Sequence, residues 1–487
     1  MDQPTRPTSR RSFLASFGRG LTGVALAAML HRDSNAATPV DLEHRWQPPD
    51  GLTHFAPQAK NVIWLFMLGG TSHVESFDPK PALIKYAGKT IEESPYGEEV
   101  LGSPHYRNRV RDFAGVPRGL MPKLYPLQAG FRKWGQSGIE ISDWWSHLGQ
   151  CADDIAVIRS MWTTDNDHAA QLQFHTGRHI FDGFYPSIGS WVNYGLGSLN
   201  DNLPKFVVMG GQPGDCCGGV GAHGPSYLGP AHAGVPIRVD PANPLPFGSP
   251  GANVFQQERR DQLDLLDELN QLAALEYPHD GAMRARIKSY ELAFRMQMSV
   301  PGTLKTTDET AQTHRLYGLE GAETKQFGRL CLLARRMVER GVRFVQLYDD
   351  GWDSHSKLKE SHGKRIKAVD QPIAALLRDL KQRGLLDETL VVWATEFGRT
   401  PGAERSDGRD HHPYGFSVWM AGGGLKRGVV HGATDELGFH AVEHRHYVTD
   451  VHATLLHQLG LDPNRLQVPG HKRLEIDLGR PIQEIIA

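Results

Sequence analysis

The chain has 487 residues, and its 53 Lys and Arg nearly balance its 55 Asp and Glu, for a formal charge of −2. This balance argues against a nucleic-acid-binding protein, because such proteins usually carry a strong basic excess. An apolar fraction of 39% argues against both an integral membrane protein and a disordered chain. The length fits two or three units of about 150 residues, or one large α/β enzyme with insertions.

The first 37 residues are typical of an export signal. Ser9-Arg10-Arg11-Ser12-Phe13-Leu14 is a twin-arginine pattern, and the apolar run Leu21–Leu30 is shorter than the roughly 20 residues that span a bilayer. Small residues at 34, 36 and 37 suit cleavage. We therefore predict a twin-arginine signal peptide over 1–37, passage through the Tat translocase, a periplasmic or extracellular location, and no stable membrane span in the mature chain.

The first elements expected after the signal are buried strands. Asn61–Leu68 is a continuous apolar run ended by glycines, which is typical of a strand buried on both faces. Further strands are expected at Ile155–Arg159 and Lys205–Met209. Gly210–Gly251 is rich in Gly and Pro and predicts a long loop, whereas Gln257–Met298 has the apolar spacing of a helical cap.

The last third of the chain alternates strands and helices more regularly. In chain order we expect helix Leu330–Gly341, strand Arg343–Tyr348, amphipathic helix Arg365–Arg383, strand Thr389–Ala394, strand Phe416–Ala421 and helix Val451–Leu459. This rhythm predicts an α/β fold with a doubly wound, mostly parallel sheet flanked by helices. We place a linker at 38–60 and one domain at 61–487, with a loop-rich and helical insertion at about 210–300.

Polar side chains follow three of these strands, at the edge where open α/β sheets place their chemistry. They are Thr71, Ser72, His73, Glu75 and Asp78 after the first strand, Asp349, Asp350, Asp353 and His355 after Arg343–Tyr348, and Glu396, Arg399, Asp410, His411 and His412 after Thr389–Ala394. Carboxylates with imidazoles suit Zn²⁺, Mn²⁺ or Fe, and carboxylates alone suit Ca²⁺ or Mg²⁺. The pattern predicts a divalent metal site and leaves the metal open, along with the choice between His411 and His412. Later histidines such as His444 and His446 are interpreted as exposed.

A further polar segment, Thr163–His168, precedes a predicted helical stretch. Its hydroxyls, carboxylates and imidazole could bind an anion or a metal at a helix N-terminus. Alternatively, Asp165 or Asn166 is an ordinary N-cap. A Ser-His-Asp hydrolase is disfavoured because the chain has no G-x-S-x-G elbow.

Several of these motifs occur in the order found in a known family. They are Gly69-Gly70-Thr71-Ser72-His73, Phe77-Asp78-Pro79-Lys80, Gly351-Trp352-Asp353-Ser354-His355, Glu396-Phe397-Gly398-Arg399-Thr400-Pro401 and Gly408-Arg409-Asp410-His411. From about Asn61 onward the chain resembles the DUF1501 family of exported bacterial proteins, often described as sulfatase-like. That family is placed in the alkaline phosphatase-like superfamily. The resemblance therefore implies an alkaline phosphatase-like core and metal-assisted chemistry on sulfate or phosphate esters.

The resemblance also implies metal ligands. Asp353 and His355 match the Asp/His metal pair of the superfamily, and His411, with Asp410 beside it, matches its last histidine ligand. Glu396 stands where that pattern has an Asp followed by a His. The first strand ends in glycine where the superfamily has a metal-binding Asp, and the substitutes nearby are Ser72, Glu75 and Asp78.

The nucleophile departs from the sulfatase pattern. Thr176-Gly177-Arg178 is present, but Asp167 and His168 stand upstream of it where sulfatases carry a Cys or Ser. A two-step mechanism would need Thr163, Thr164 or Ser72 as the nucleophile. Direct attack by a metal-activated water needs none of them, and loss of catalysis is the third alternative.

The predicted function is therefore an exported metal-dependent hydrolase of sulfate or phosphate esters. Asp353, His355, Glu396, Asp410 and His411 are the expected ligands, and His168 is a further ligand or the general acid. Arg399 or Arg178 would neutralise the anionic group of a small-molecule or polysaccharide ester. The alternative is a non-catalytic binding protein on the same fold, recognising sulfated polysaccharide or other exported partners.

Overall fold

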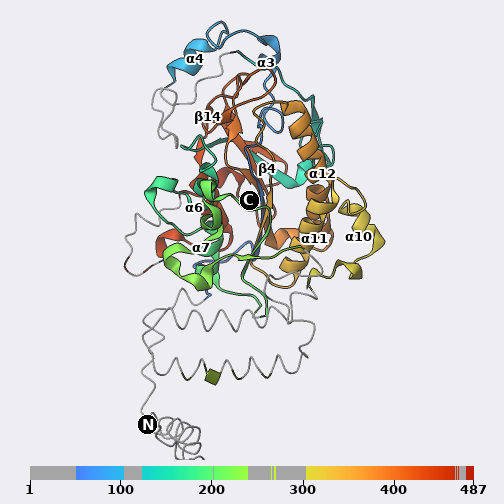
Figure 1. Cartoon of the computed structure of the whole chain (residues 1–487), viewed down its shortest axis with the longest axis vertical. Coiled ribbons are helices and arrows are strands. Elements are labelled where there is room, and N and C mark those ends of the chain that lie inside the picture. The colour runs from blue at the N-terminus through green and yellow to red at the C-terminus, as the bar shows by residue number, and fades with distance from the viewer. Residues whose placement is uncertain are drawn as a thin grey trace, which may run out of the picture. The chain divides into compact units, whose positions relative to one another are not determined.

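The computed structural model describes residues 51–103, 123–200, 202–239, 303–466 and 479–487, with isolated positions within 261–272 and 468–470. A nine-stranded central sheet runs through this part of the chain (Figure 1). Its strands are β1 (Asn61–Met67), β4 (Ile155–Trp162), β5 (Phe206–Gly210), β6 (Val235–Pro236), β7 (Phe344–Asp349), β8 (Thr389–Thr395), β11 (Phe416–Ala421), β12 (Val429–His431) and β15 (His446–Tyr447). Their order is β12-β4-β11-β8-β1-β7-β5-β6, and β15 also pairs with β4.

The sheet is mostly parallel, as predicted, and only β11 runs antiparallel to its neighbours β4 and β8. The reason lies in the connection from β8 to β11, which contains the short strands β9 (Gly398–Arg399) and β10 (His411–His412) but no helix. A parallel neighbour requires a long crossover, usually helical, so a strand reached without one returns in the opposite direction.

Helices cover both faces of the sheet, which confirms the doubly wound α/β class. On one face, α11 (Lys325–Glu339) and α12 (Leu358–Gln382) pack against the sheet. On the other lie α6 (Ala170–Thr176), α7 (Ile188–Leu196) and α13 (Val448–Gln458). This arrangement buries the sheet between two apolar layers, as a parallel sheet requires.

Strand β1 shows how the sequence produces this burial. All seven of its residues are buried. Ile63 and Leu65 belong to the apolar cluster beneath α11 and α12, whereas Trp64 and Phe66 belong to the cluster on the opposite face. Successive side chains of a strand point to opposite faces, so an unbroken apolar run fits a strand covered on both sides.

Smaller elements accompany the sheet and the helices that cover it. They are α3 (Pro81–Lys85), α4 (Gly97–Gly102), β2 (Phe131–Trp134), β3 (Ile139–Ser142), α10 (Ala311–Leu316), β13 (Ala433–Thr434), β14 (Ala441–Glu443) and the 3-10 helix η13 (Gln483–Ile485). Between β5 and β6 the chain forms four short 3-10 helices within residues 215–232. The predicted signal peptide over 1–37 and all but isolated positions of the predicted helix Gln257–Met298 lie outside the described residues.

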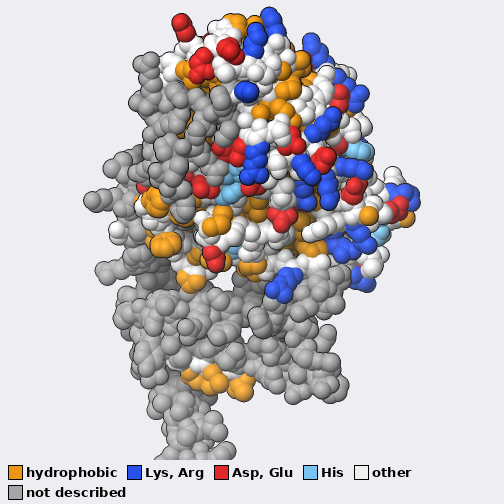
Figure 2. Space-filling model, turned by 45° about the horizontal axis from the view of Figure 1, so that its top comes forward, with side chains coloured by type: hydrophobic (Ala, Val, Ile, Leu, Met, Phe, Trp, Pro, Cys, Tyr) orange, Lys and Arg blue, Asp and Glu red, His pale blue; other side chains and the backbone are white. Residues whose placement is uncertain are grey.

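Figure 2 shows acidic and basic side chains intermingled over the described part of the visible face. Within the described ranges, no helix combines the length and apolarity needed to cross a membrane.

Candidate metal centre

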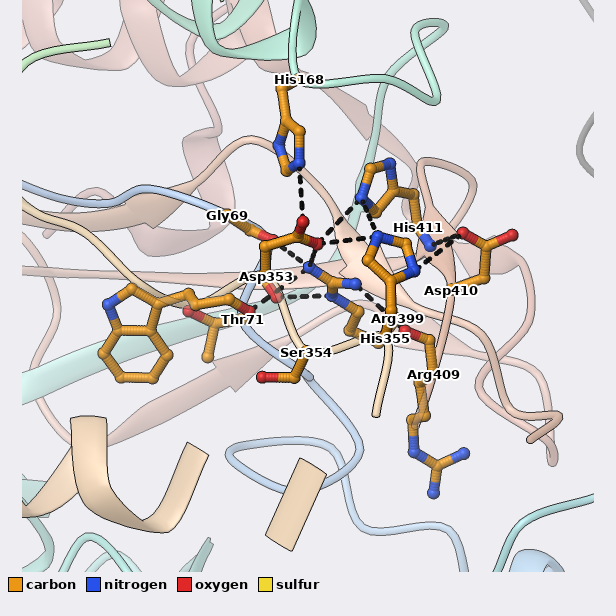
Figure 3. A network of polar contacts seen from close by, with 12 residues as sticks. Gly69, Thr71, His168, Asp353, Ser354, His355, Arg399, Arg409, Asp410 and His411 are labelled. Atoms are coloured by element: carbon orange, nitrogen blue, oxygen red, sulfur yellow. Dashed lines mark hydrogen bonds and ion pairs between the residues drawn. The ribbon is translucent and has the colours of Figure 1, made fainter. Parts of the chain in front are cut away.

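Segments that follow three parallel strands meet at one edge of the sheet. His168 follows β4, Asp353 and His355 follow β7, and His411 lies in β10, beyond β8. Because these strands run in the same direction, their carboxyl ends bring the segments together. We call His168, Asp353, His355 and His411 the Asp353 centre (Figure 3).

The two glycines after β1 allow the backbone to pack closely beneath this centre. Gly69 has a φ of 122°, and a Cβ on it would lie 2.4 Å from the backbone N of Asp353. Gly70 has a φ of 87°, and a Cβ on it would lie 2.4 Å from the ring of Phe397. Both the left-handed backbone and the lack of space favour glycine. No acidic ligand can therefore occupy these two positions without displacing the centre.

The three histidines of the centre direct their Nε2 atoms at the Asp353 carboxylate. His168 Nε2 lies 3.2 Å from Asp353 Oδ2, while His355 Nε2 and His411 Nε2 lie 3.0 and 3.1 Å from Oδ1. His355 Nε2 and His411 Nε2 are themselves only 3.1 Å apart. Groups distant in the sequence thus converge on one point, and the structure brings together the predicted site residues Asp353, His355 and His411.

Each of these histidines is held from behind by an acceptor at Nδ1. His168 Nδ1 lies 3.1 Å from Glu396 Oε1, and His411 Nδ1 lies 2.9 Å from the carbonyl oxygen of Asn166. His355 Nδ1 contacts the carboxylate of Glu404. An acceptor at Nδ1 keeps the proton on that nitrogen and leaves the Nε2 lone pair for a cation, which is the usual environment of metal-binding histidine.

The centre has an electrostatic preference for positive charge. Burial would lower the pKa of His168, but hydrogen bonds to Asp353 and Glu396 outweigh this effect and raise that pKa to about 10. Hydrogen bonding to Asp353 raises the pKa of His355. Burial would raise the pKa of Asp353, yet hydrogen bonds from the three histidines lower it overall. The site therefore attracts a cation, either protons on the rings or a metal between them.

The donor set fits a divalent transition metal. The ligand atoms of His168, Asp353 and His411 lie within 4.8 Å of one another, as do those of His355, Asp410 and His411. Several imidazole nitrogens with a carboxylate suit Zn²⁺ or Mn²⁺ better than Ca²⁺ or Mg²⁺, which prefer oxygen ligands. The Asp353 side chain is 39% exposed, so the centre opens to solvent on one side.

Arg399 is completely buried against this centre. Its Nη2 lies 2.7 Å from Asp353 Oδ1, and the same nitrogen donates to the carbonyl of Gly69. Its Nε donates to the carbonyl of Gly70 at 2.8 Å, and Nη1 to that of Arg409 at 3.0 Å. The guanidinium thus links the end of β1 to the loop after β8 and holds the Asp353 carboxylate in place.

A second buried arginine lies in the layer beneath. Arg409 Nη2 lies 2.7 Å from Glu75 Oε1, and both side chains are fully buried. Ser72 Oγ donates to the other oxygen of Glu75. Glu75 and Ser72, which the sequence suggested as substitute ligands, are thus placed within a buried ionic layer rather than in the Asp353 centre.

The remaining predicted residues have other surroundings. Of the two adjacent histidines, His411 is the one that contacts Asp353. His412 Nε2 instead contacts the carbonyl of Phe439, and burial lowers the pKa of the His412 ring. His73 lies 2.8 Å from the carbonyl of Gly438. The Asp78 carboxylate pairs with Lys80 at 3.1 Å, and Asp167 Oδ1 accepts from the backbone N of His168 at 2.8 Å. The guanidinium of Arg178 lies over the ring of Tyr185.

Some residues of the site were not found by sequence reasoning. Gln171 Nε2 donates to Glu396 Oε1 at 3.0 Å, and the backbone N of Gly69 donates to the same oxygen at 2.8 Å. Gln171 follows His168 by three residues in the segment that begins α6, and this helical spacing could have indicated it. Glu404 lies in a loop without periodicity, where no sequence signal marks its contact with His355.

Most of the chain matches one family. The sequence pattern described as "Protein of unknown function (DUF1501)" covers residues 59–486. The chain belongs to the DUF1501 family. This confirms the resemblance inferred from the motifs around Gly69, Asp353, Glu396 and Asp410. No curated protein matches this DUF1501 chain.

Solved structures are similar to this DUF1501 protein only at low identity. A phosphonate monoester hydrolase from Silicibacter pomeroyi is 13% identical, with a TM-score of 0.33 over 69% of this chain and 71% of its own. An alkaline phosphatase superfamily protein from Vibrio parahaemolyticus is 10% identical, with a TM-score of 0.35 over 89% and 72%. The PsFucS1 sulfatase from Pseudoalteromonas sp. is 11% identical, with a TM-score of 0.34 over 87% and 73%.

Proposed function

We propose that this DUF1501 protein is an exported, metal-dependent hydrolase of sulfate or phosphate esters. One observation carries the proposal: three histidine Nε2 atoms converge on the Asp353 carboxylate, and each ring is held at Nδ1 by an acceptor. His168, Asp353 and His411 would hold the cation, with His355 beside them. Glu396 would support His168 rather than bind the metal directly.

The chemistry that a bound Zn²⁺ or Mn²⁺ supplies is polarisation of the ester and a lowered pKa of a bound water. The protein's own groups provide the setting. Arg399 positions Asp353, while Glu396 and Gln171 position His168. The exposed side of Asp353 leaves room for an anionic ester to approach, whether it is a small molecule or part of a polysaccharide.

The surroundings of the candidate hydroxyls favour water as the nucleophile. Ser72 is fully buried and donates to Glu75. Thr163 Oγ1 donates to Gln173 Oε1 at 2.6 Å, and Thr164 Oγ1 accepts from Gln173 Nε2 at 2.6 Å. A side-chain nucleophile must be free to reach the ester and must have a base to activate it. Direct attack by water requires neither hydroxyl to leave its partner.

The same engaged hydroxyls support a second candidate function. A protein that has lost its nucleophile could keep the metal and the sheet and act as a binding protein for sulfated polysaccharide or for other exported proteins. Export itself is proposed from the twin-arginine pattern at 9–14.

Metal analysis followed by turnover assays tests the two candidates. The purified chain is assayed with nitrophenyl sulfate and nitrophenyl phosphate, with and without a chelator. We expect stoichiometric metal and chelator-sensitive turnover that falls about a thousandfold or more in Asp353→Ala. Asp350→Ala, an exposed carboxylate on the same loop, is the matched control and should retain turnover. Bound metal without turnover of either ester would favour the binding protein.

A further inference from the structure

A second group of histidines and a carboxylate lies along the edge of the sheet, on elements that do not contribute to the Asp353 centre. His431, His446 and Glu484 offer ligand atoms that all lie within 4.8 Å of one another. His431 Nε2 is 2.9 Å from His446 Nε2 and 3.8 Å from Glu484 Oε2. We call these three residues the His431 cluster.

The sheet topology explains why the two histidines meet. Strands β12 and β15 both pair in parallel with β4, with His431 opposite Ile158 and His446 opposite Met161. His431 is the last residue of β12 and His446 the first of β15. The two strands therefore follow one another along the same edge of β4, and the chain between them leaves and returns through β13 and β14.

Glu484 is brought to the cluster by the C-terminal segment. The backbone N of Lys426 donates to the carbonyl of Ile485 at 2.8 Å, and that of Ala487 donates to the carbonyl of Gly424 at 3.1 Å. Ile485 is fully buried. These contacts fix the backbone of η13 beside β12, while the Glu484 side chain remains 52% exposed and free to take up a ligand geometry.

His446 is arranged as a metal-binding histidine usually is. His446 Nδ1 lies 3.0 Å from Asp450 Oδ2, and Asp450 Oδ1 accepts from the backbone N of Arg480 at 3.0 Å. A carboxylate behind Nδ1 orients the ring and leaves Nε2 as the ligating atom. The side chains of His431 and His446 are only 9% and 14% exposed, so their facing nitrogens are largely shielded from water. Two such nitrogens need either a shared proton or a cation between them.

We propose that His431, His446 and Glu484 form a second metal site, independent of the proposed ester chemistry. Two imidazoles and one carboxylate are a ligand set that Zn²⁺ accepts, with a water in the fourth position. A bound ion would tie the edge strands β12 and β15 to the C-terminal segment. Its role would be to stabilise this edge of the sheet, because metal binding to a folded site adds to the free energy of unfolding.

Zinc binding to the full-length chain tests the proposal. In an Asp353→Ala background, which weakens the first centre, we expect Zn²⁺ still to bind and to raise the melting temperature. Adding His446→Gln or His431→Gln should remove one equivalent of bound zinc together with the rise in melting temperature. The matched controls are His457→Gln, on the same helix as Asp450, and Glu443→Gln, an exposed carboxylate of β14; neither should change zinc binding.

Co²⁺ substitution gives a readout that a merely structural histidine would not move. The absorption bands of the bound Co²⁺ should disappear with His446→Gln in the same background and persist in the controls. If the histidine variants have a lower melting temperature without metal, Glu484→Gln is used in their place. Because the Glu484 side chain is exposed, this substitution should weaken zinc binding by about tenfold or more without affecting folding. The proposal is overturned if the Asp353→Ala protein binds no zinc, or if its zinc is unaffected by all three substitutions.

Discussion

The Asp353 centre and the His431 cluster use the same ligand types but differ in how firmly these are held. In the Asp353 centre every histidine has an acceptor behind it, and the fully buried Arg399 contacts the central carboxylate. In the His431 cluster Asp450 orients His446, and Glu484 is half exposed on the C-terminal segment.

This difference fits the two roles proposed for these sites. Chemistry requires ligands held in position before the substrate arrives, and the carboxyl ends of several strands supply them from rigid elements. An ion that ties an edge strand to a terminal segment needs only enough ligands to hold two segments together. The difference also predicts that the Asp353 centre depends on buried charges beneath it, whereas the His431 cluster depends on the neighbouring side chain of Asp450.

The largest effect is expected from removing the buried charge under the Asp353 centre. Arg409→Met would leave the fully buried Glu75 carboxylate without its positively charged partner and would also remove donors to the carbonyls of Thr400 and Pro401. We expect the free energy of unfolding, measured by chemical denaturation, to fall by about 3–5 kcal/mol.

A double variant separates the lost partner from the lost volume. In Arg409→Met combined with Glu75→Leu, no unpaired charge remains, so part of the stability should return. A double variant as unstable as Arg409→Met alone would show that the ion pair is not what supports this layer.

A smaller effect is expected from acid, acting on a buried neutral histidine beside the Asp353 centre. His362 Nε2 accepts from the backbone N of Ser72 at 3.0 Å, and its Nδ1 lies 2.9 Å from Ser354 Oγ. Burial lowers the pKa of His362 to about 3. Between that value and the ordinary 6.5, the unfolded state binds a proton that the folded state does not. The stability contributed by His362 is therefore complete above pH 6.5 and lost as the pH falls toward 3.

Chemical denaturation of the metal-free chain between pH 7 and pH 4 measures this loss. One such histidine lowers the free energy of unfolding by about 1.4 kcal/mol for each unit by which the pH falls in this range. His362→Gln keeps a polar side chain and should reduce the slope by about that amount. Other buried histidines, such as His175, contribute equally to the pH dependence of the unaltered chain and of His362→Gln. An equal slope of the free energy of unfolding against pH in these two proteins would therefore contradict the role of His362.

The strands and the general position of the Asp353 centre could be predicted because both result from local patterns. The apolar runs of β1, β7 and β8 identify strands buried on both faces, and the parallel arrangement places the segments after these strands at one edge of the sheet. Asp353, His355 and His411 were therefore predicted together. The direction of each side chain could not be predicted in the same way. Glu396 directly follows β8 but lies behind His168, because the backbone N of Gly69 and the side chain of Gln171 hold its carboxylate there.

The His431 cluster was missed for a different reason. β12 and β15 have three and two residues, too few for an alternating pattern to identify a strand. Only their shared pairing with β4 brings His431 and His446 together, and His446 was interpreted as exposed although its side chain is 14% exposed. Sites assembled by long-range pairing of short segments leave no local signal in the sequence.

The smallest effect tests the dependence of the His431 cluster on its orienting carboxylate. Asp450→Asn keeps the size of the side chain but removes the charge behind His446 Nδ1. We expect the zinc affinity of this cluster, measured by titration in the Asp353→Ala background, to fall about tenfold. Asp387→Asn, which changes an exposed carboxylate elsewhere, is the control and should leave it unchanged. An undiminished zinc affinity in Asp450→Asn would mean that the pairing of β12 and β15 with β4 alone orients the rings of His431 and His446. The Asp353 centre and the His431 cluster would then differ in their backbone framework rather than in their supporting side chains.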